Sequence, residues 1–259
     1  MSTDARNAPC PVIVMGTGGH AAVLIDALQQ SGRVVLGCLD PNAAPGSHGP
    51  LDTAILGGDI ALEQYPPHAV ELVNGVGATD AATMPGGQLR SQLHRIWTER
   101  GYAFAAVIHP AATIASGCDL GEGVQIMAGA VVQTGTRIGD GGIINTGARI
   151  DHDCRIAASV HVAPGAVLCG AVTIDEGAFV GAGATIVPGV RIGAAARVAA
   201  GMTILGDVPP NARITPENSG FWRPQPQPQT ASHATLGAVA MNPYSLSGNI
   251  KRDYRVFGA

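Results

Sequence analysis

Between Ile108 and Ile204 the sequence places an aliphatic residue at every sixth position. All 17 residues of this series are Ile, Leu or Val, without an insertion or slip. The residue three places after each one is mostly glycine, and the next is usually small or β-branched. A period of six is neither the 3.6 of a helix nor the 2 of a plain strand. It predicts short strands and turns in alternation, and an ordinary β-sandwich would not keep so regular a spacing.

The repeat is the hexapeptide pattern of an all-β left-handed parallel β-helix, with three hexapeptides in each triangular coil. Seventeen repeats correspond to between five and six coils. We expect the aliphatic side chains to point into the core, together with the small residue two places before each of them. Glycine takes the turn, where it adopts a positive φ at least cost. Cys154 falls in a small inward position, so we expect it to pack in the core rather than to carry an acyl group.

A different pattern precedes the repeat. An apolar run at 11–15 leads into Gly16-Thr17-Gly18-Gly19-His20, then an amphipathic stretch at 21–30 and a second apolar run at 34–39 that ends at Asp40. This order predicts an α/β, Rossmann-like unit. A further strand at 70–73, a helix at 88–100 and a last strand at 102–107 complete it. The glycine spacing is not the full GxGxxG, which argues against classical NAD binding. It suits a nucleotide sugar with its diphosphate at the helix N-terminus, or a tight turn without a ligand.

We therefore predict three regions. Residues 1–106 form a Rossmann-like domain suited to binding a sugar nucleotide, residues 107–208 form the β-helix domain, and residues 209–259 form a Pro-rich linker and tail of unknown role. Three arginines on the predicted helix at 88–100 are expected to be solvated: Arg90, Arg95 and Arg100.

Composition narrows the function classes. The chain has 259 residues, of which 13% are charged, and a net charge of −4, which gives no footprint for nucleic acid. Lys251 is the only lysine, so Walker-type phosphate binding and lysine Schiff-base chemistry have no residue in either domain. No apolar run is long enough to span a membrane, and the first residues lack the order of a signal peptide. The five cysteines include no CxxC pair, which predicts reduced thiols and a cytoplasmic location.

Three motifs in order carry a resemblance that spans about residues 11–208. The loop at 16–20, the segment Ile144–Cys154 and the segment Val160–Ala166 with Cys169-Gly170 resemble the bacterial sugar O-/N-acyltransferases. This family includes sialic-acid O-acetyltransferases and acetyltransferases of nucleotide-linked 4-amino-4,6-dideoxy sugars.

The resemblance implies roles for individual residues. His152 would be the general base and Asp153 would orient and polarise it. His161 and the backbone amide of Gly170 would lie at the acetyl-CoA thioester. The nucleotide sugar would be held by Gly16, Gly18, Gly19, His20, Asp40 and Asn145. No metal is implied.

We therefore predict a cytoplasmic, acetyl-CoA-dependent acetyltransferase of polysaccharide biosynthesis, in which the sugar amine attacks the thioester directly. The nine residues between His152 and His161 are half of a coil, so the two side chains are not expected to touch within one chain. A shared site would lie between the subunits of a homotrimer. Three alternatives remain open: O-acetylation of sialic acid or another sugar hydroxyl, a metal hydratase on the same prism, and a non-catalytic assembly platform. The hydratase needs three histidine ligands, and the repeat from Ile114 to Ile204 holds only two histidines.

Overall fold

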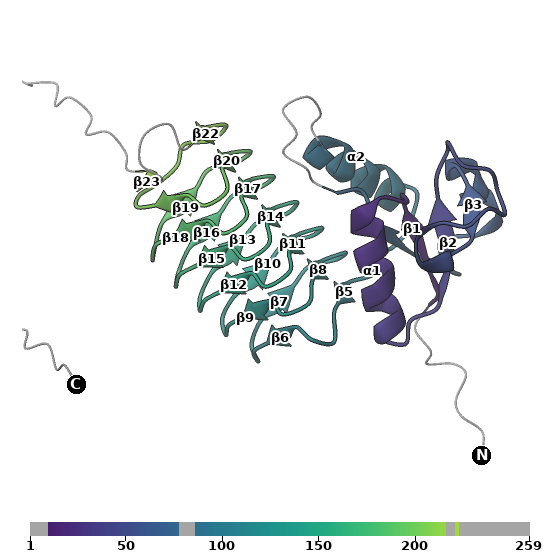
Figure 1. The fold of residues 1–259 in the computed structure, drawn as a ribbon, viewed down its shortest axis with the longest axis horizontal. Coiled ribbons are helices and arrows are strands. Elements are labelled where there is room, and N and C mark those ends of the chain that lie inside the picture. Colours follow the sequence, from purple (N-terminus) through teal and green to yellow (C-terminus); the bar gives the residue numbers. More distant parts are fainter. Residues whose placement is uncertain (1–9, 78–85, 216–220, 223–259) are drawn as a thin grey trace, which may run out of the picture. The chain divides into compact units, whose positions relative to one another are not determined.

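A computed structural model describes residues 10–77, 86–215 and 221–222, and these residues belong to one compact unit of the chain. In the N-terminal domain, four parallel strands form a sheet in the order β3-β2-β1-β4 (Figure 1). The bounds are β1 Val12–Met15, β2 Val35–Leu39, β3 Ile55–Gly57 and β4 Glu71–Asn74. Parallel order around a first strand that leads into a glycine loop is the arrangement predicted for a Rossmann-like unit.

Helices cover both faces of this sheet because its strands are apolar on both sides. Val12 and Val14 pack with buried residues of α1 (Gly19–Gln30), whereas Ile13 and Met15 pack with η2 (Asp59–Gln64) and with Trp97 of α2 (Gly86–Glu99). A short 3-10 helix, η1, spans Pro50–Asp52. The strand predicted at 102–107 is reduced to a parallel bridge between Leu72 and Phe104. Val107 already belongs to the β-helix.

From Val107 onward the chain winds into the left-handed parallel β-helix, whose strands are two residues long and form three parallel sheets (Figure 1). The β5 sheet contains β5 Val107–Ile108, β8 Gln125–Ile126, β11 Ile143–Ile144, β14 His161–Val162, β17 Phe179–Val180, β20 Arg197–Val198 and β22 Arg213–Ile214. The β6 sheet contains β6 Thr113–Ile114, β9 Val131–Val132, β12 Arg149–Ile150, β15 Val167–Leu168, β18 Thr185–Ile186, β21 Thr203–Ile204 and β23 Phe221–Trp222. The β7 sheet contains β7 Asp119–Leu120, β10 Arg137–Ile138, β13 Arg155–Ile156, β16 Thr173–Ile174 and β19 Arg191–Ile192.

The register explains the hexapeptide pattern. Ile126 pairs with Ile144 and Ile144 with Val162, so each residue of a strand meets the residue 18 places further along. The core consists of the aliphatic series from Ile126 onward and of the small inward residues, including Ala130, Ala148 and Ala166. The turn glycines have positive φ, as Gly129 and Gly147 do. Both predicted inward positions are therefore confirmed from Ile126 onward, whereas Ile108, the first residue of the series, is 38% exposed.

The far end of the β-helix continues past residue 208, near which the sequence predicted closure. Val208 bridges Ile192 two residues earlier than the period requires, and Ile214 then pairs with Val198. The shortening lies in the corner before Val208, because only residues 205–207 separate it from Ile204; the next step, from Val208 to Ile214, again covers six residues. Of the tail predicted for 209–259, residues 216–220 and 223–259 lie outside the described residues.

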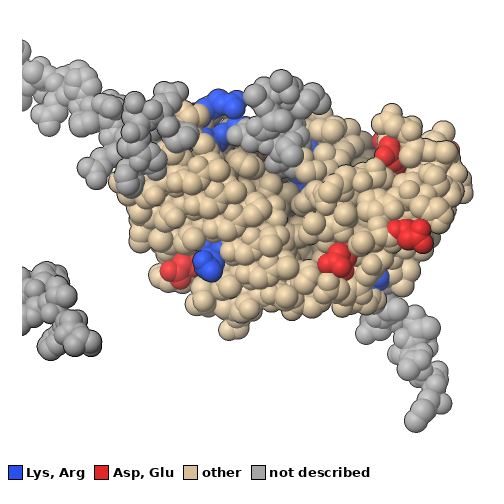
Figure 2. Space-filling view, viewed as in Figure 1, with Lys and Arg blue, Asp and Glu red and all other residues tan. Residues whose placement is uncertain are grey.

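Charged side chains are sparse on the face that Figure 2 shows, in keeping with the 13% of charged residues in the sequence. Neither α1 nor α2, nor any other helix in the described ranges, is long and apolar enough to cross a membrane.

Candidate active site

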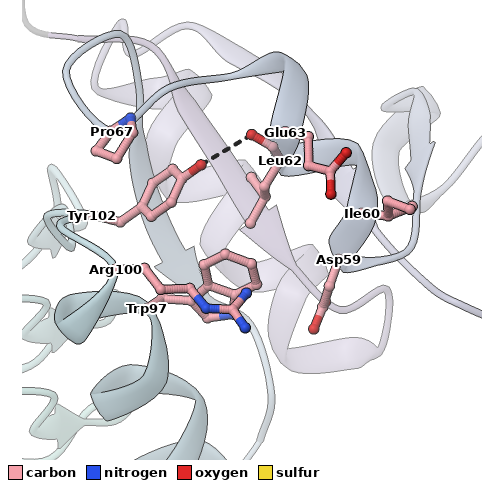
Figure 3. A pocket seen from close by; sticks show the side chains of 8 residues that line it. All are labelled: Asp59, Ile60, Leu62, Glu63, Pro67, Trp97, Arg100 and Tyr102. Atoms are coloured by element: carbon pink, nitrogen blue, oxygen red, sulfur yellow. Dashed lines mark hydrogen bonds between the residues drawn. The ribbon is translucent and has the colours of Figure 1, made fainter.

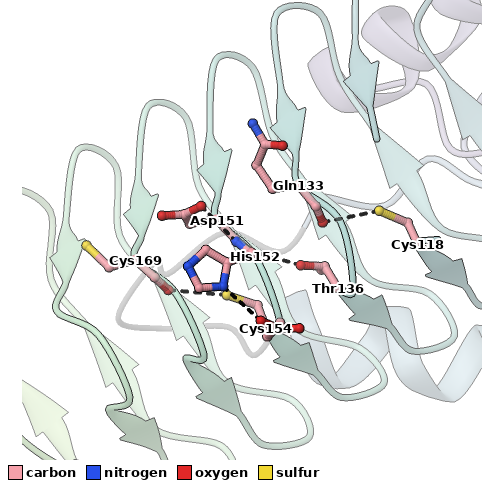
Figure 4. A network of polar contacts seen from close by, with 8 residues as sticks. Cys118, Gln133, Thr136, Asp151, His152, Cys154 and Cys169 are labelled. Carbon is pink, nitrogen blue, oxygen red and sulfur yellow. Dashed lines mark hydrogen bonds and ion pairs between the residues drawn. The ribbon is translucent and has the colours of Figure 1, made fainter. Parts of the chain in front are cut away.

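His152 lies at the corner that connects β12 to β13, beside Asp151 (Figure 4). Its Nδ1 lies 2.8 Å from Oδ2 of Asp153. A carboxylate only accepts hydrogen bonds, so Nδ1 carries a proton and donates it. In the neutral ring Nε2 is then the unprotonated nitrogen. The side chain of His152 is 57% exposed, which leaves that basic nitrogen accessible to a substrate.

The backbone at Asp153 explains how the carboxylate reaches this position. Asp153 occupies the turn position that holds glycine in most coils, and its φ is 59°. Aspartate is one of the few residues that visit this left-handed region. One coil earlier, a Cβ at Gly135 would lie only 2.5 Å from Oδ1 of Asp153. Glycine at 135 therefore leaves the space that the carboxylate needs.

Both neighbouring aspartates raise the pKa of His152. The hydrogen bond that His152 donates to Asp153 contributes most, followed by the charge of Asp151, and both favour the protonated ring. Asp151 also accepts the backbone N–H of His152 through Oδ1 at 2.8 Å. The ring is thus held at the corner by one carboxylate on its side chain and one on its backbone, and its affinity for a proton is increased.

Gly170 lies against the imidazole from the next coil. A Cβ at this position would come within 2.7 Å of both Cε1 and Nε2 of His152. Only a residue without a side chain allows the ring and this backbone to approach so closely. The structure therefore brings together His152, Asp153 and Gly170 of the predicted site residues.

His161 lies elsewhere, on β14 of the β5 sheet, and only 9% of it is exposed. Nδ2 of Asn145 donates to its Nε2 at 3.2 Å, and the ring of Phe179 packs edge-on at 5.1 Å. Asn145 and His161 thus form a second group of predicted residues. His152 follows a strand of the β6 sheet instead, so its ring belongs to a different part of the β-helix surface.

Cys154 is fully buried, and its thiol donates to the Cys169 carbonyl at 3.3 Å. Burial raises the pKa of this thiol to about 11. An un-ionised, buried thiol is a poor nucleophile, which agrees with the packing role predicted for it.

The glycine loop of the N-terminal domain follows β1. Gly16 has a φ of 99° and packs against the backbone of Gly75, while Gly18 is the N-cap residue of α1. Thr17 donates a hydrogen bond to Asp40 at the end of β2. That bond, together with one from the Asn42 backbone, lowers the pKa of Asp40. A cavity of about 400 Å³ opens beside Thr17 and Asp40.

His20 turns from this loop toward the β-helix. Its Nε2 donates to Oε1 of Gln125 on β8 at 2.8 Å. Burial is the largest cause that lowers the pKa of His20, to about 4, and the charge of Arg90 adds to it. His20 is therefore neutral near pH 7 and contacts the first coils of the β-helix.

Arg90 corrects the expectation that the arginines of α2 are all solvated. It is only 4% exposed, and its guanidinium donates to the carbonyls of Asn74, Val76 and Gly141. Burial lowers the pKa of Arg90 to about 9. Gln125 donates to the same Asn74 carbonyl at 2.9 Å. Arg90 and Gln125 thus fasten the end of β4 to the β-helix, a role that helical periodicity alone cannot reveal.

A further cavity of about 350 Å³ lies within the N-terminal domain, between η2 and the end of α2 (Figure 3). Trp97, Arg100 and Tyr102 line it, and the Tyr102 hydroxyl donates to the Leu62 carbonyl at 3.0 Å. None of the predicted site residues borders it. Within the described part of the chain, no three His, Cys, Asp or Glu side chains gather as a metal site would require.

Comparison with known proteins finds relatives for the N-terminal domain by itself and for the two domains together. Residues 11–81 match the family model of the PglD N-terminal domain. PerB from Caulobacter crescentus, solved in complex with CoA and GDP-perosamine, is 36% identical, with a TM-score of 0.71 over 80% of this chain and 94% of that one. The acetyltransferase domain of PglB from Neisseria gonorrhoeae is 30% identical, with a TM-score of 0.70 over 78% and 94% of the two chains. That domain has also been solved with acetyl coenzyme A.

WeeI from Acinetobacter baumannii shares the fold at 20% identity, with a TM-score of 0.69 over 79% of this chain and 96% of that one. A search of curated protein sequences gives no match. Identity of 30–36% over nearly the whole length of the PglB acetyltransferase domain and of PerB, together with the matching N-terminal domain, decides the family. The chain belongs to the bacterial sugar acyltransferases with hexapeptide repeats, and it is an acetyl-CoA-dependent sugar acetyltransferase.

Proposed function

We propose that this acetyltransferase acts on the amino group of a nucleotide-linked 4-amino-4,6-dideoxy sugar, with His152 as general base and Asp153 as the residue that orients it. The observation that carries the proposal is the 2.8 Å contact between His152 Nδ1 and Asp153 Oδ2, which directs the basic Nε2 outward. The relative PerB has been crystallised with CoA and GDP-perosamine. It has also been crystallised with one histidine replaced by asparagine or alanine.

The reaction needs no covalent enzyme intermediate. The sugar amine attacks the thioester carbonyl, and His152 Nε2 takes the proton that the nitrogen loses as the C–N bond forms. The C–S bond then breaks, and the thiolate of CoA leaves and is protonated. The products are the N-acetylated sugar and free CoA. The backbone N–H of Gly170 would stabilise the negative charge that develops on the carbonyl oxygen, an effect often worth about 3 kcal/mol.

The two substrates would approach from opposite ends of the β5 sheet. Residues 1–106 would hold the nucleotide sugar through the loop at 16–20 and Asp40. His20 contacts Gln125 of β8. In the β5 sheet, Gln125 pairs with Ile143 and Ile143 pairs with His161, so the three residues form one row across the strands. Asn145 beside His161 would then meet the sugar, and His161 would lie at the thioester. Residues 107–208 would thus carry the transfer step.

A homotrimer would complete the site. His152 and His161 lie at different places on one β-helix, so one chain does not present base and thioester site together. A neighbouring subunit that places its corner beside the β5 sheet would bring the two together. An isolated subunit should then bind acetyl-CoA weakly and have no transferase activity.

The test follows release of the CoA thiol from acetyl-CoA with a panel of acceptors: GDP- and UDP-linked 4-amino sugars and free sialic acid. Wild type is compared with His152→Ala, His152→Asn and the control His68→Ala, a change at an exposed residue of the N-terminal domain. Turnover of one nucleotide amino sugar, lost in both His152 variants and kept in the control, supports the proposal.

Other outcomes contradict it in distinct ways. Turnover of free sialic acid, without turnover of any nucleotide-linked amino sugar, would show an O-acetyltransferase in which His152 is still the general base. Full activity of His152→Asn removes His152 from the mechanism. Thiol release that persists in a monomeric form, measured by light scattering under assay conditions, contradicts the shared site.

A further inference from the structure

One column of side chains runs along the outer side of the β5 sheet. The register pairs His161 with Phe179, Phe179 with Arg197, and Arg197 with Arg213. The Phe179 ring and the His161 ring meet edge-on with their centroids 5.1 Å apart, and the Arg197 guanidinium lies over the Phe179 ring, 5.8 Å from its centroid. The proposed thioester site is therefore joined, through one aromatic ring, to two arginines on successive strands.

The arginines border a large cavity. It has a volume of about 760 Å³ and lies between α2 and the corners that lead into the β5 sheet. Arg95, Arg197 and Arg213 contribute three positive charges to its lining, and Asp140 and Glu176 contribute two negative ones. Asp140 already accepts the backbone N–H of Glu122 through Oδ1 at 2.9 Å. The recess thus carries an excess of one positive charge, on a chain whose net charge is −4.

We propose that Arg197 and Arg213 bind the phosphate groups of acetyl-CoA. The inference rests on the proposed function, which places the thioester at His161. Guanidinium groups match phosphate oxygens in geometry and charge, and arginine is the usual residue for such recognition. Two arginines on neighbouring strands suit a ligand that carries both a diphosphate and a 3′-phosphate.

The spacing of the column fits this ligand. Neighbouring strands are about 4.8 Å apart, so three steps separate His161 from Arg213 by about 14 Å. The extended pantetheine arm of CoA can span that distance. It would run over Phe179, whose ring gives the arm an apolar surface, and would reach the arginines with its charged end. The coenzyme would then approach His161 from the side opposite to the nucleotide-binding loop.

The experiment measures CoA binding by isothermal titration calorimetry, which needs no acceptor. The variants are Arg197→Gln and Arg213→Gln. The matched control is Arg191→Gln, which removes the same charge from the β7 sheet, where Arg191 is paired with Asp175 at 2.8 Å. Each protein is titrated with CoA, with 3′-dephospho-CoA and with pantetheine. Melting temperatures verify that the variants are folded.

We expect each of the two changes to raise the Kd for CoA about tenfold or more, because each removes a charged hydrogen-bond donor. The Kd for pantetheine should be equal in wild type and variants, and the control should bind CoA as the wild type does. Loss of the preference for CoA over 3′-dephospho-CoA in one variant would assign the 3′-phosphate to that arginine.

Three results would overturn the inference. Unchanged CoA binding in both variants removes the arginines from the coenzyme site, and equal loss of pantetheine binding shows a packing role. A variant that binds CoA normally but has a raised KM for the nucleotide sugar assigns the recess to the acceptor. Failure of the wild type to bind CoA at all would instead contradict the proposed function.

Discussion

Gly170→Ala should reduce acetyl transfer while leaving the fold intact. The new Cβ would lie 2.7 Å from Cε1 and Nε2 of His152, whereas carbon atoms in contact are about 3.5–4.0 Å apart. The imidazole must therefore retreat by about 1 Å. The ring is the far end of an exposed side chain, so the movement should cost less than about 1 kcal/mol of stability. A misplacement of 1 Å in an active site costs about 100-fold in rate.

The assay compares kcat of wild type and Gly170→Ala by release of the CoA thiol, with thermal melting measured on the same samples. We expect kcat to fall about 100-fold and the melting temperature to stay within about 2 °C. Retreat of the ring also lengthens its bond to Asp153, so the acid limb of the pH–rate profile should move to lower pH. The matched control repeats the change in a His152→Ala background, where it should have no further effect. Wild-type kcat in Gly170→Ala, or an equal loss in both backgrounds, would refute the reasoning.

Three more predictions follow from the hydrogen bonds and pKa shifts. Asp153→Asn removes the main cause of the raised pKa of His152. Since the base must be deprotonated, the acid limb of the pH profile of kcat/KM should move to lower pH, and kcat should fall about tenfold or more. An acid limb at the wild-type pH would contradict this. The pKa of His20 is about 4 in the folded protein, against 6.5 in the unfolded chain. Between pH 6.5 and 5, therefore, the unfolded state binds a proton at His20 that the folded state does not bind. Urea unfolding should then show a loss of about 2 kcal/mol of stability over this window, which is absent in His20→Asn and kept in the control His68→Asn. Arg90→Leu leaves the carbonyls of Val76 and Gly141 without this donor, while the Asn74 carbonyl keeps its bond from Gln125. The change should lower the free energy of unfolding by about 3 kcal/mol; wild-type stability in the same assay would show that the buried guanidinium contributes nothing.

The periodic part of the fold could be read from the sequence because each position of the hexapeptide has one environment. The aliphatic series from Ile126 and the small residues such as Ala148 lie inside a narrow core, so their identity reports their direction. The irregular corner at 205–207 follows the last regular repeat at Ile204, and periodicity could not say that pairing resumes two residues early, first at Val208 and then at Ile214.

The contacts between the two domains could not be read in this way. Arg90 and Gln125 each look like ordinary polar residues of a helix and a strand, and only their burial against Asn74 distinguishes them. The arginine column could have been found by writing the sequence in rows of 18, which places His161, Phe179 and Arg197 in one line. Asp153 gave a comparable signal, because it replaces glycine at a turn.

The first coil of the β-helix has unpaired strand edges within the described residues, and the brevity of its strands has a consequence for self-association. β5, β6 and β7 each stand first in their sheet within the described residues, and Ile108 is 38% exposed where its equivalent in the next coil, Ile126, is fully buried. Unpaired strand edges commonly invite another chain to add to the sheet. Here each edge offers only two residues, and Val107 on β5 is packed into the same core as α1. A second molecule would gain few hydrogen bonds by stacking on this coil. The first coil therefore does not favour end-to-end stacking of β-helices into a fibre.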